Sequence, residues 1–327
     1  MNFYNLKHKE EQLNFKEATI KGQGKDKGLF FPEDISKFSN EFLQNLPNLS
    51  NEEIAFQVMK DFAGDEIPEA ELRKIVAETI AFEIPLKKVT ENISVLELFH
   101  GPTLAFKDVG ARFMSRCLGY FLKNETRKVT VLVATSGDTG GAVANGFYDV
   151  EGIEVVILYP KNRVSPVQEK QLTALGKNIH ALEVNGSFDD CQALVKQAFS
   201  DESLTEKLLL TSANSINVAR WLPQQIYYVL ALKQWLKIHS ENPVICVPSG
   251  NFGNICAGIL AHHRGLPVEH FIAACNVNDV VPEYLRTEIL QPKETVATIS
   301  NAMDVGDPSN FVRILELFDK EFNQVKN

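Results

Sequence analysis

The residue of this 327-residue sequence best suited to chemistry is Lys107, in the segment His100-Gly101-Pro102-Thr103-Leu104-Ala105-Phe106-Lys107-Asp108. Apolar residues recur at helical spacing after Gly110, which predicts a helix over 110–121 with Lys107 just before its N-terminus. The helix dipole and an apolar surround both disfavour an ammonium group, so Lys107 is a candidate nucleophile or base of lowered pKa, able to form a Schiff base. The alternative is a solvated lysine paired with Asp108, because most lysines lie at protein surfaces.

Two glycine-rich loops each follow a predicted strand and precede a predicted helix. Their sequences are Thr135-Ser136-Gly137-Asp138-Thr139-Gly140-Gly141-Ala142 and Pro248-Ser249-Gly250-Asn251-Phe252-Gly253-Asn254. Glycine lets the backbone approach a ligand, and free N–H groups and hydroxyls at such turns suit an anion. Strand-to-helix turns are also glycine-rich for geometry alone, so neither loop decides a function by itself.

A third polar cluster, Asn214-Ser215-Ile216-Asn217 with Arg220, also follows a predicted strand. The arginine offers a planar fork that matches a carboxylate or a phosphate. The alternative is that an asparagine caps the following helix and that Arg220 is exposed. The residues alone leave both interpretations open.

The elements that must position these groups alternate between strand and helix. Short apolar runs predict strands buried on both faces over 129–134, 155–159, 208–210, 244–247 and 271–274. Helices are predicted between them, including one over 218–238, and this alternation indicates an α/β fold with parallel sheets. Residues 1–92 are expected to form a separate, mainly helical region, with a helix capped by Ser50 and Glu53 and another opened by Pro68. The run Gly22–Gly28 has the wrong spacing for a dinucleotide fingerprint and is interpreted as a surface loop.

Composition excludes several function classes. The formal net charge of −9 and the lack of a long basic run argue against nucleic-acid binding. No apolar run is long enough to span a bilayer, and the first twelve residues lack a signal-peptide pattern, so a cytoplasmic protein without a membrane partner is expected. The five cysteines are scattered and are expected to be reduced core residues. No metal site is expected, because His262-His263 has no carboxylates nearby.

These ordered motifs resemble the threonine synthase family, and 271–276 and 300–304 extend the resemblance over essentially the whole chain. The resemblance implies a pyridoxal 5′-phosphate (PLP) enzyme of fold type II, similar to the tryptophan synthase β chain, with two α/β domains and a mainly helical N-terminal region. The implied division is 1–92 for the N-terminal region, 93–113 with 223–327 for a large PLP domain, and 114–222 for a smaller mobile domain.

The resemblance also implies roles for residues. Lys107 would carry PLP as a Schiff base and act as the catalytic acid and base. The cofactor would be held by Lys107, Asp138, Gly250, Asn251, Phe252, Gly253 and Asn254. The substrate would be held by Ser136, Gly137, Thr139, Asn214, Ser215 and Arg220. Many relatives have Asn where this chain has Asp138, so the role of that carboxylate is open.

The implied reaction converts O-phospho-L-homoserine and water to L-threonine and phosphate, with the departing phosphate as a base for the attacking water. The family continues with a C-terminal segment that contacts the pyridine nitrogen, and the predicted amphipathic helix 311–322 needs a partner, so we expect a truncated chain. The alternatives are another fold-type II lyase, such as a threonine or serine dehydratase, and a catalytically dead phosphate-binding module. The sequence does not give the oligomeric state or any allosteric effector.

Overall fold

The computed structural model describes residues 1–123 and 128–326. Its largest sheet consists of β6 (Val129–Ala134), β7 (Ile153–Pro160), β8 (Ile179–Val184) and β9 (Leu209–Ser212), in the order β8-β7-β6-β9 and parallel throughout. The predicted parallel α/β architecture is therefore confirmed. The sequence prediction missed β8, because this strand interrupts its apolar residues with His180 and Glu183.

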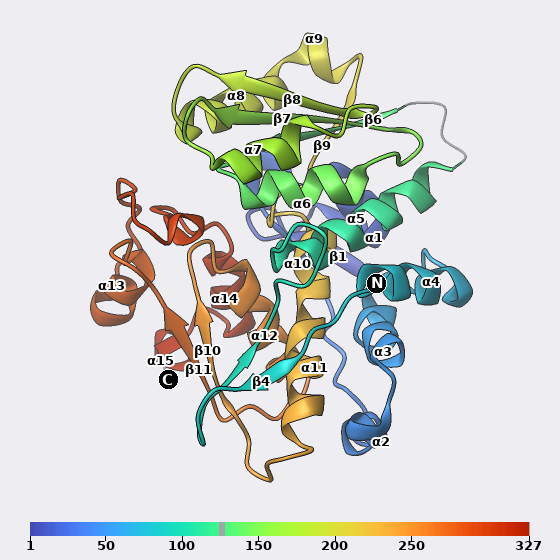
Figure 1. Ribbon diagram of the computed structural model, residues 1–327, viewed down its shortest axis with the longest axis vertical. Helices are drawn as coiled ribbons and strands as arrows, with labels where there is room; N and C mark the ends of the chain where they lie inside the picture. The colour runs from blue at the N-terminus through green and yellow to red at the C-terminus, as the bar shows by residue number, and fades with distance from the viewer. Residues whose placement is uncertain (124–127, 327) are drawn as a thin grey trace.

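Helices cover both faces of this sheet, as Figure 1 shows. Val129, Val131 and Val133 of β6 belong to the main hydrophobic core, on the side of α5 (Lys107–Leu122) and α6 (Asp138–Phe147). Leu132 and Ala134 point to the opposite face, where they pack with α8 (Phe188–Ser200). Helices α7 (Pro166–Thr173) and α9 (Glu202–Thr205) complete this part of the molecule. Because successive strand residues alternate faces, a strand that is buried throughout needs both helical layers.

A second parallel pair joins β10 (Val244–Pro248) and β11 (His270–Ala274). Both strands were predicted to be buried on both faces, and this prediction is wrong. Val244 is 53% exposed and Ile272 is 46% exposed, because one face of the pair has no covering layer in the described chain. Cys246 lies on this face, so it is not the core residue that was expected, although all five cysteines are free.

The first 92 residues contain more strand than predicted. The strands β1 (Asn2–Asn5), β2 (Gln12–Asn14) and β3 (Phe30–Pro32) form an antiparallel sheet, in the order β2-β1-β3. Strands of three or four residues are too short for a periodicity to show in the sequence. The region also contains α1 (Phe15–Lys21), α2 (Asn40–Asn45), α3 (Asn51–Ala63) and α4 (Glu69–Thr79), and a hairpin of β4 (Leu86–Lys88) and β5 (Ser94–Leu96) crosses its C-terminal boundary. The division into domains stays a prediction.

Two caps in this region can be compared with their predictions. Ser50 caps α3 by accepting a hydrogen bond from the N–H of Glu53, and α4 begins directly after Pro68. The Glu53 side chain does not return to Ser50, however, because it binds Gln57 and Arg73. The N-cap is therefore confirmed, without the reciprocal half of a capping box.

Helix boundaries differ from prediction at two places that matter for the site. Helix α5 begins at Lys107 itself, so the lysine is the first helical residue and does not precede the helix. The single helix predicted over 218–238 is divided into α10 (Val218–Trp221), the 3-10 turn η3 (Leu222–Gln224) and α11 (Gln225–Trp235). Pro223 lies in that turn, because proline cannot continue a helix without losing a backbone hydrogen bond.

The C-terminal helix is also divided, into α14 (Phe311–Leu317) and α15 (Phe322–Lys326). Asp319 and Lys320 between them have positive φ values of 51° and 62°, which end the first helix. Its apolar side was expected to lack a partner, but Phe311, Ile314 and Leu317 are buried, and α14 packs on α12 (Gly253–His263). Helix α13 (Val280–Thr287) lies nearby (Figure 1). Across the described ranges, no helix combines the length and apolar character needed to cross a membrane.

Candidate active site

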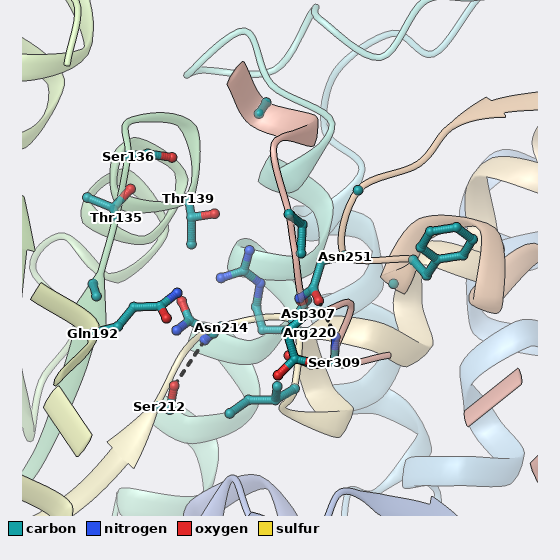
Figure 2. A pocket seen from close by; sticks show the side chains of 18 of the residues that line it. Thr135, Ser136, Thr139, Gln192, Ser212, Asn214, Arg220, Asn251, Asp307 and Ser309 are labelled. Atoms are coloured by element: carbon teal, nitrogen blue, oxygen red, sulfur yellow. Dashed lines mark hydrogen bonds between the residues drawn. The ribbon is translucent and has the colours of Figure 1, made fainter. Parts of the chain in front are cut away.

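A cavity of about 910 Å³ opens where the two glycine-rich loops and the third polar cluster meet. Figure 2 shows Thr135, Ser136 and Thr139 on one side, Asn251 and Ser309 on the other, and Asn214 and Arg220 between them. All of the predicted site residues except Gly137 line this cavity: Lys107, Ser136, Asp138, Thr139, Asn214, Ser215, Arg220, Gly250, Asn251, Phe252, Gly253 and Asn254. The fold therefore brings together motifs that are far apart in the sequence.

Lys107 lies at the wall of the cavity with its side chain 17% exposed. Its Nζ atom is 3.5 Å from Oδ2 of Asp138 and 4.8 Å from the centre of the Phe106 ring. Desolvation lowers the pKa of Lys107, with a smaller contribution from the charge of Arg220, while Asp138 acts in the opposite direction. The alternative of a solvated lysine paired with Asp108 is wrong, because the Asp108 carboxylate is buried and binds the N–H and hydroxyl of Thr103.

The loop 250–254 presents a row of free donors to the cavity. The backbone N–H groups of these five residues donate to no other group in the described chain. Phe252 has a left-handed conformation, with φ of 61°, immediately before α12 begins at Gly253. A left-handed residue at the start of a right-handed helix turns successive N–H groups toward one point, which is the arrangement that binds an anion. Such backbone strain in a non-glycine residue is typical of a functional site.

The loop 135–139 is organised by Thr135, which sequence reasoning did not single out. Its hydroxyl accepts hydrogen bonds from the N–H groups of Gly137 at 2.9 Å and Gly140 at 2.8 Å. The N–H groups of Ser136, Asp138 and Thr139 remain without a partner in the described chain. Three donors and two hydroxyls at one helix start fit a carboxylate.

In the third cluster, the two asparagines have different surroundings. Asn217 caps α10, as the structural interpretation allowed for one of the asparagines, and it also donates to the carbonyl oxygen of Thr19. Asn214 lines the cavity. Arg220 is only 3% exposed, so the alternative of an exposed arginine is wrong. Its Nη1 donates to the Ala213 carbonyl, while its Nε is buried without a partner in the described chain. Burial lowers the pKa of Arg220 to about 10. No carboxylate of the described residues forms an ion pair with this cation at the cavity.

Sequence reasoning missed several contributors to the site. Gln168 of α7 donates to Oδ1 of Asp138 at 2.8 Å, and it also takes part in the capping box with Ser165 that begins this helix. Residues of the Gly22–Gly28 loop, among them Gln23 and Lys27, line the cavity, so this segment is more than a surface loop. The turn η4 (Asn301–Met303) also reaches the cavity.

Comparison with known proteins agrees with this geometry. The family described as “Threonine synthase N terminus” matches residues 2–80, and the family described as “Pyridoxal-phosphate dependent enzyme” matches residues 79–326. The threonine synthase of Haemophilus influenzae is 50% identical over 320 residues, which cover 98% of this chain and 74% of the relative. The threonine synthase of Escherichia coli is 48% identical over 326 residues, which cover 100% of this chain and 76% of the relative.

The chain belongs to the threonine synthase family. Among solved structures, the threonine synthase of Escherichia coli superposes with a TM-score of 0.93 and 48% identity, over 100% of this chain and 76% of the other. The PLP-bound threonine synthase of Brucella melitensis superposes with a TM-score of 0.91 and 38% identity, over 100% of this chain and 72% of the other. The fold is that of the PLP-dependent threonine synthases, and the cofactor is PLP. The recognition of the family and of fold type II from the sequence is confirmed.

Proposed function

We propose that this chain converts O-phospho-L-homoserine and water to L-threonine and phosphate, with Lys107 as the residue that carries PLP and moves protons. The observation that carries the proposal is the position of Lys107. Its largely desolvated amine lies in one cavity with a loop of free N–H groups and with an arginine whose Nε has no partner among the described residues. A PLP enzyme acting on a phosphorylated amino acid needs an amine of low pKa, one anion site for the cofactor and another for the substrate. The cavity offers all three.

The residues present fit PLP. We propose that the N–H groups of 250–254 hold the cofactor's phosphate, because no acidic side chain belongs to that loop and its donors are free. Lys107 and Asp138 would complete the set of residues that hold the cofactor, because both line the same cavity as this loop. When bound, PLP supplies an electron sink that stabilises negative charge developing on carbon atoms of the substrate.

Lys107 is the proposed acid and base. Desolvation favours its neutral amine, which can take a proton from the substrate's Cα and return it to another carbon. Asp138 receives one hydrogen bond from Gln168 and faces Lys107 at 3.5 Å, so it favours the charged form of the lysine. The pKa of Lys107 is therefore set by two opposing effects, which are burial of the amine and the charge of one nearby carboxylate.

Two groups of residues would orient the substrate. We propose that the N–H groups and hydroxyls of Ser136 and Thr139 bind its carboxylate. The N–H of Gly137 is already bound to Thr135, so we propose only a conformational role for that glycine, whose φ of 139° few other residues adopt.

The substrate's phosphate would be bound by Asn214, Ser215 and Arg220. The strongest reason for this placement is that Nε of Arg220 has no partner among the residues at positions 1–123 and 128–326. A buried donor without a partner is unfavourable and favours an anionic ligand. Held there after it leaves the substrate's Cγ, the phosphate would lie close enough to accept a proton from the water that adds at Cβ.

The test is to incubate the purified chain with PLP, treat it with borohydride and map the modified peptide. We expect the pyridoxyl group on Lys107, together with release of phosphate and formation of threonine from O-phospho-L-homoserine. Lys107→Ala should abolish both the modification and turnover, whereas Lys161→Ala, which changes a half-exposed lysine that does not line the cavity, should keep them. Modification of another lysine, or near-normal turnover by Lys107→Ala, would refute the assignment.

A further inference from the structure

The hydroxyl of Ser215 receives two hydrogen bonds from neighbouring amides. Its Oγ atom is 2.8 Å from Nδ2 of Asn251 and 3.2 Å from Nδ2 of Asn310. A serine oxygen has two acceptor positions and one O–H. Both acceptor positions are therefore filled, and the O–H donates to no group among the residues that the structure describes, although Ser215 lines the cavity. Its proton is left for a ligand.

The orientation of both amides follows from their other partners. Oδ1 of Asn251 accepts from the backbone N–H of Ser309 at 2.7 Å, and Oδ1 of Asn310 accepts from Nη1 of Arg313 at 2.7 Å. Turning either amide over would place its NH₂ group against a donor. Each NH₂ group must therefore face Ser215. Because both amides donate to the serine oxygen, the serine proton must point away from them.

Arg313 fixes this arrangement from behind the cavity. Its guanidinium is fully buried, lies 4.3 Å from the centre of the Trp221 ring, and donates to the carbonyl oxygens of Phe30, Ser215 and Ile216. No carboxylate of the described chain forms an ion pair with it. It therefore holds the backbone of Ser215 and the amide oxygen of Asn310 at the same time.

We propose that Asn310 is a positioning residue that keeps the Ser215 hydroxyl as a hydrogen-bond donor toward the phosphate group of the substrate. The inference rests on the proposed function, because Ser215 has this role only if the chain binds a phosphorylated substrate. An ionised phosphate oxygen can only accept hydrogen bonds, so a serine whose proton was used elsewhere would present an oxygen lone pair to it. Asn310 prevents this without touching the ligand.

The decisive variant is Asn310→Asp, which changes the side chain's size little. An ionised aspartate can only accept, so Ser215 would have to donate its proton to it and lose that proton as a phosphate donor. The new carboxylate would also pair with the buried Arg313, so we expect the unfolding temperature not to fall. Phosphate affinity should fall about tenfold, the loss of one hydrogen bond to a charged group, with a similar rise in KM and little change in kcat.

Inorganic phosphate is titrated by calorimetry into the PLP-loaded chain, so that the cofactor's own phosphate site is filled. The control is Asn48→Asp, which adds the same charge at an exposed position and should bind phosphate normally. Ser215→Ala separates the hydroxyl from the added charge, because in that background Asn310→Asp should have little further effect. If Asn310→Asp does not fold, Asn310→Ala replaces it, with an expected loss of severalfold that also disappears in the Ser215→Ala background.

Three results would overturn the inference. The first is a phosphate affinity of Asn310→Asp, or of Asn310→Ala where that variant replaces it, equal to the affinity of the control Asn48→Asp. The second is an undiminished effect when Ser215 is already alanine, which would assign the loss to charge or to a general change of structure. The third is a PLP-loaded, unchanged chain that binds no phosphate, and this result alone would also refute the proposed phosphate site.

Discussion

The Nζ atom of Lys107 lies 3.5 Å from the Oδ2 atom of Asp138. This contact raises the pKa of the lysine and so opposes the effect of burial, which lowers it. Burial favours the neutral amine, and the carboxylate favours the ammonium. Between the lowered pKa of the folded chain and the ordinary pKa of an exposed lysine, the unfolded chain binds more protons. The contribution of Lys107 to stability therefore rises with pH across that interval.

Asp138→Asn should move the pH dependence of PLP attachment toward lower pH. The amide has nearly the shape of the carboxylate but no charge, so the pKa of Lys107 falls and more neutral amine is present at a given pH. We expect a shift of about one pH unit in the attachment rate, which stopped-flow absorbance can follow. A shift in the opposite direction, or none, would show that Asp138 does not favour the charged lysine.

Arg220→Met should weaken binding of the phosphorylated substrate while PLP still attaches to Lys107. The change removes a buried guanidinium whose Nε has no partner in the part of the chain that the structure describes, so the loss falls on the ligand that would supply one. We expect kcat/KM for O-phospho-L-homoserine to fall about a hundredfold, in line with one or two charge-assisted hydrogen bonds. Arg163→Met, at an exposed position, is the matched control. Equal kcat/KM in the two variants would contradict the phosphate role.

Gly250→Ala should reduce the affinity for PLP. A Cβ atom at residue 250 would lie 2.7 Å from Cα of Met303 and 2.8 Å from its carbonyl oxygen, and backbone atoms cannot move aside as a flexible side chain does. The loop 250–254 must therefore shift, and its N–H groups lose their common direction. We expect the Kd of PLP, measured by absorbance titration, to rise at least about tenfold.

The control for this prediction is Gly119→Ala. There the added Cβ would lie 3.1 Å from Cγ1 of Val150, a side-chain atom, on α5 and outside the cavity. Replacement of a helical glycine by alanine can even stabilise a chain. If both alanine variants bound PLP equally well, the close packing of Gly250 would have no bearing on the cofactor loop.

The sequence predicted the chemistry of the site better than its supporting contacts. Lys107 could be found because it precedes a predicted apolar helix, and the two glycine-rich loops and Asn214 to Arg220 could be found because each follows a predicted strand with residues whose types suggest a ligand. Gln168 could not, because it reaches Asp138 only once α7 is folded over the loop. Asn310 likewise meets Ser215 across 95 residues, and its sequence neighbours give no sign of this contact.

Prediction of the fold failed where the local pattern was short or mixed. The N-terminal sheet consists of strands of three and four residues, and β8 carries polar residues within its apolar pattern. The C-terminal helix looked continuous over 311–322 because apolar spacing does not record the left-handed residues Asp319 and Lys320. Periodicity therefore predicted that the long elements exist, but it did not predict where they end, because packing and backbone geometry determine their ends.

Arg264→Met should destabilise the chain without changing phosphate binding. Arg264 is fully buried between the rings of Phe38 and Phe62, and it donates to two backbone carbonyls, to Gln225 and to Asp61 at 2.6 Å. Its removal leaves buried acceptors and a partly buried carboxylate without a donor, so we expect the free energy of unfolding to fall by about 3 kcal/mol in urea titrations. Asp61→Asn keeps the guanidinium and its carbonyl partners and should cost only about 1 kcal/mol. Equal losses in the two variants would show that the ion pair, and not the carbonyl contacts, dominates the contribution of Arg264.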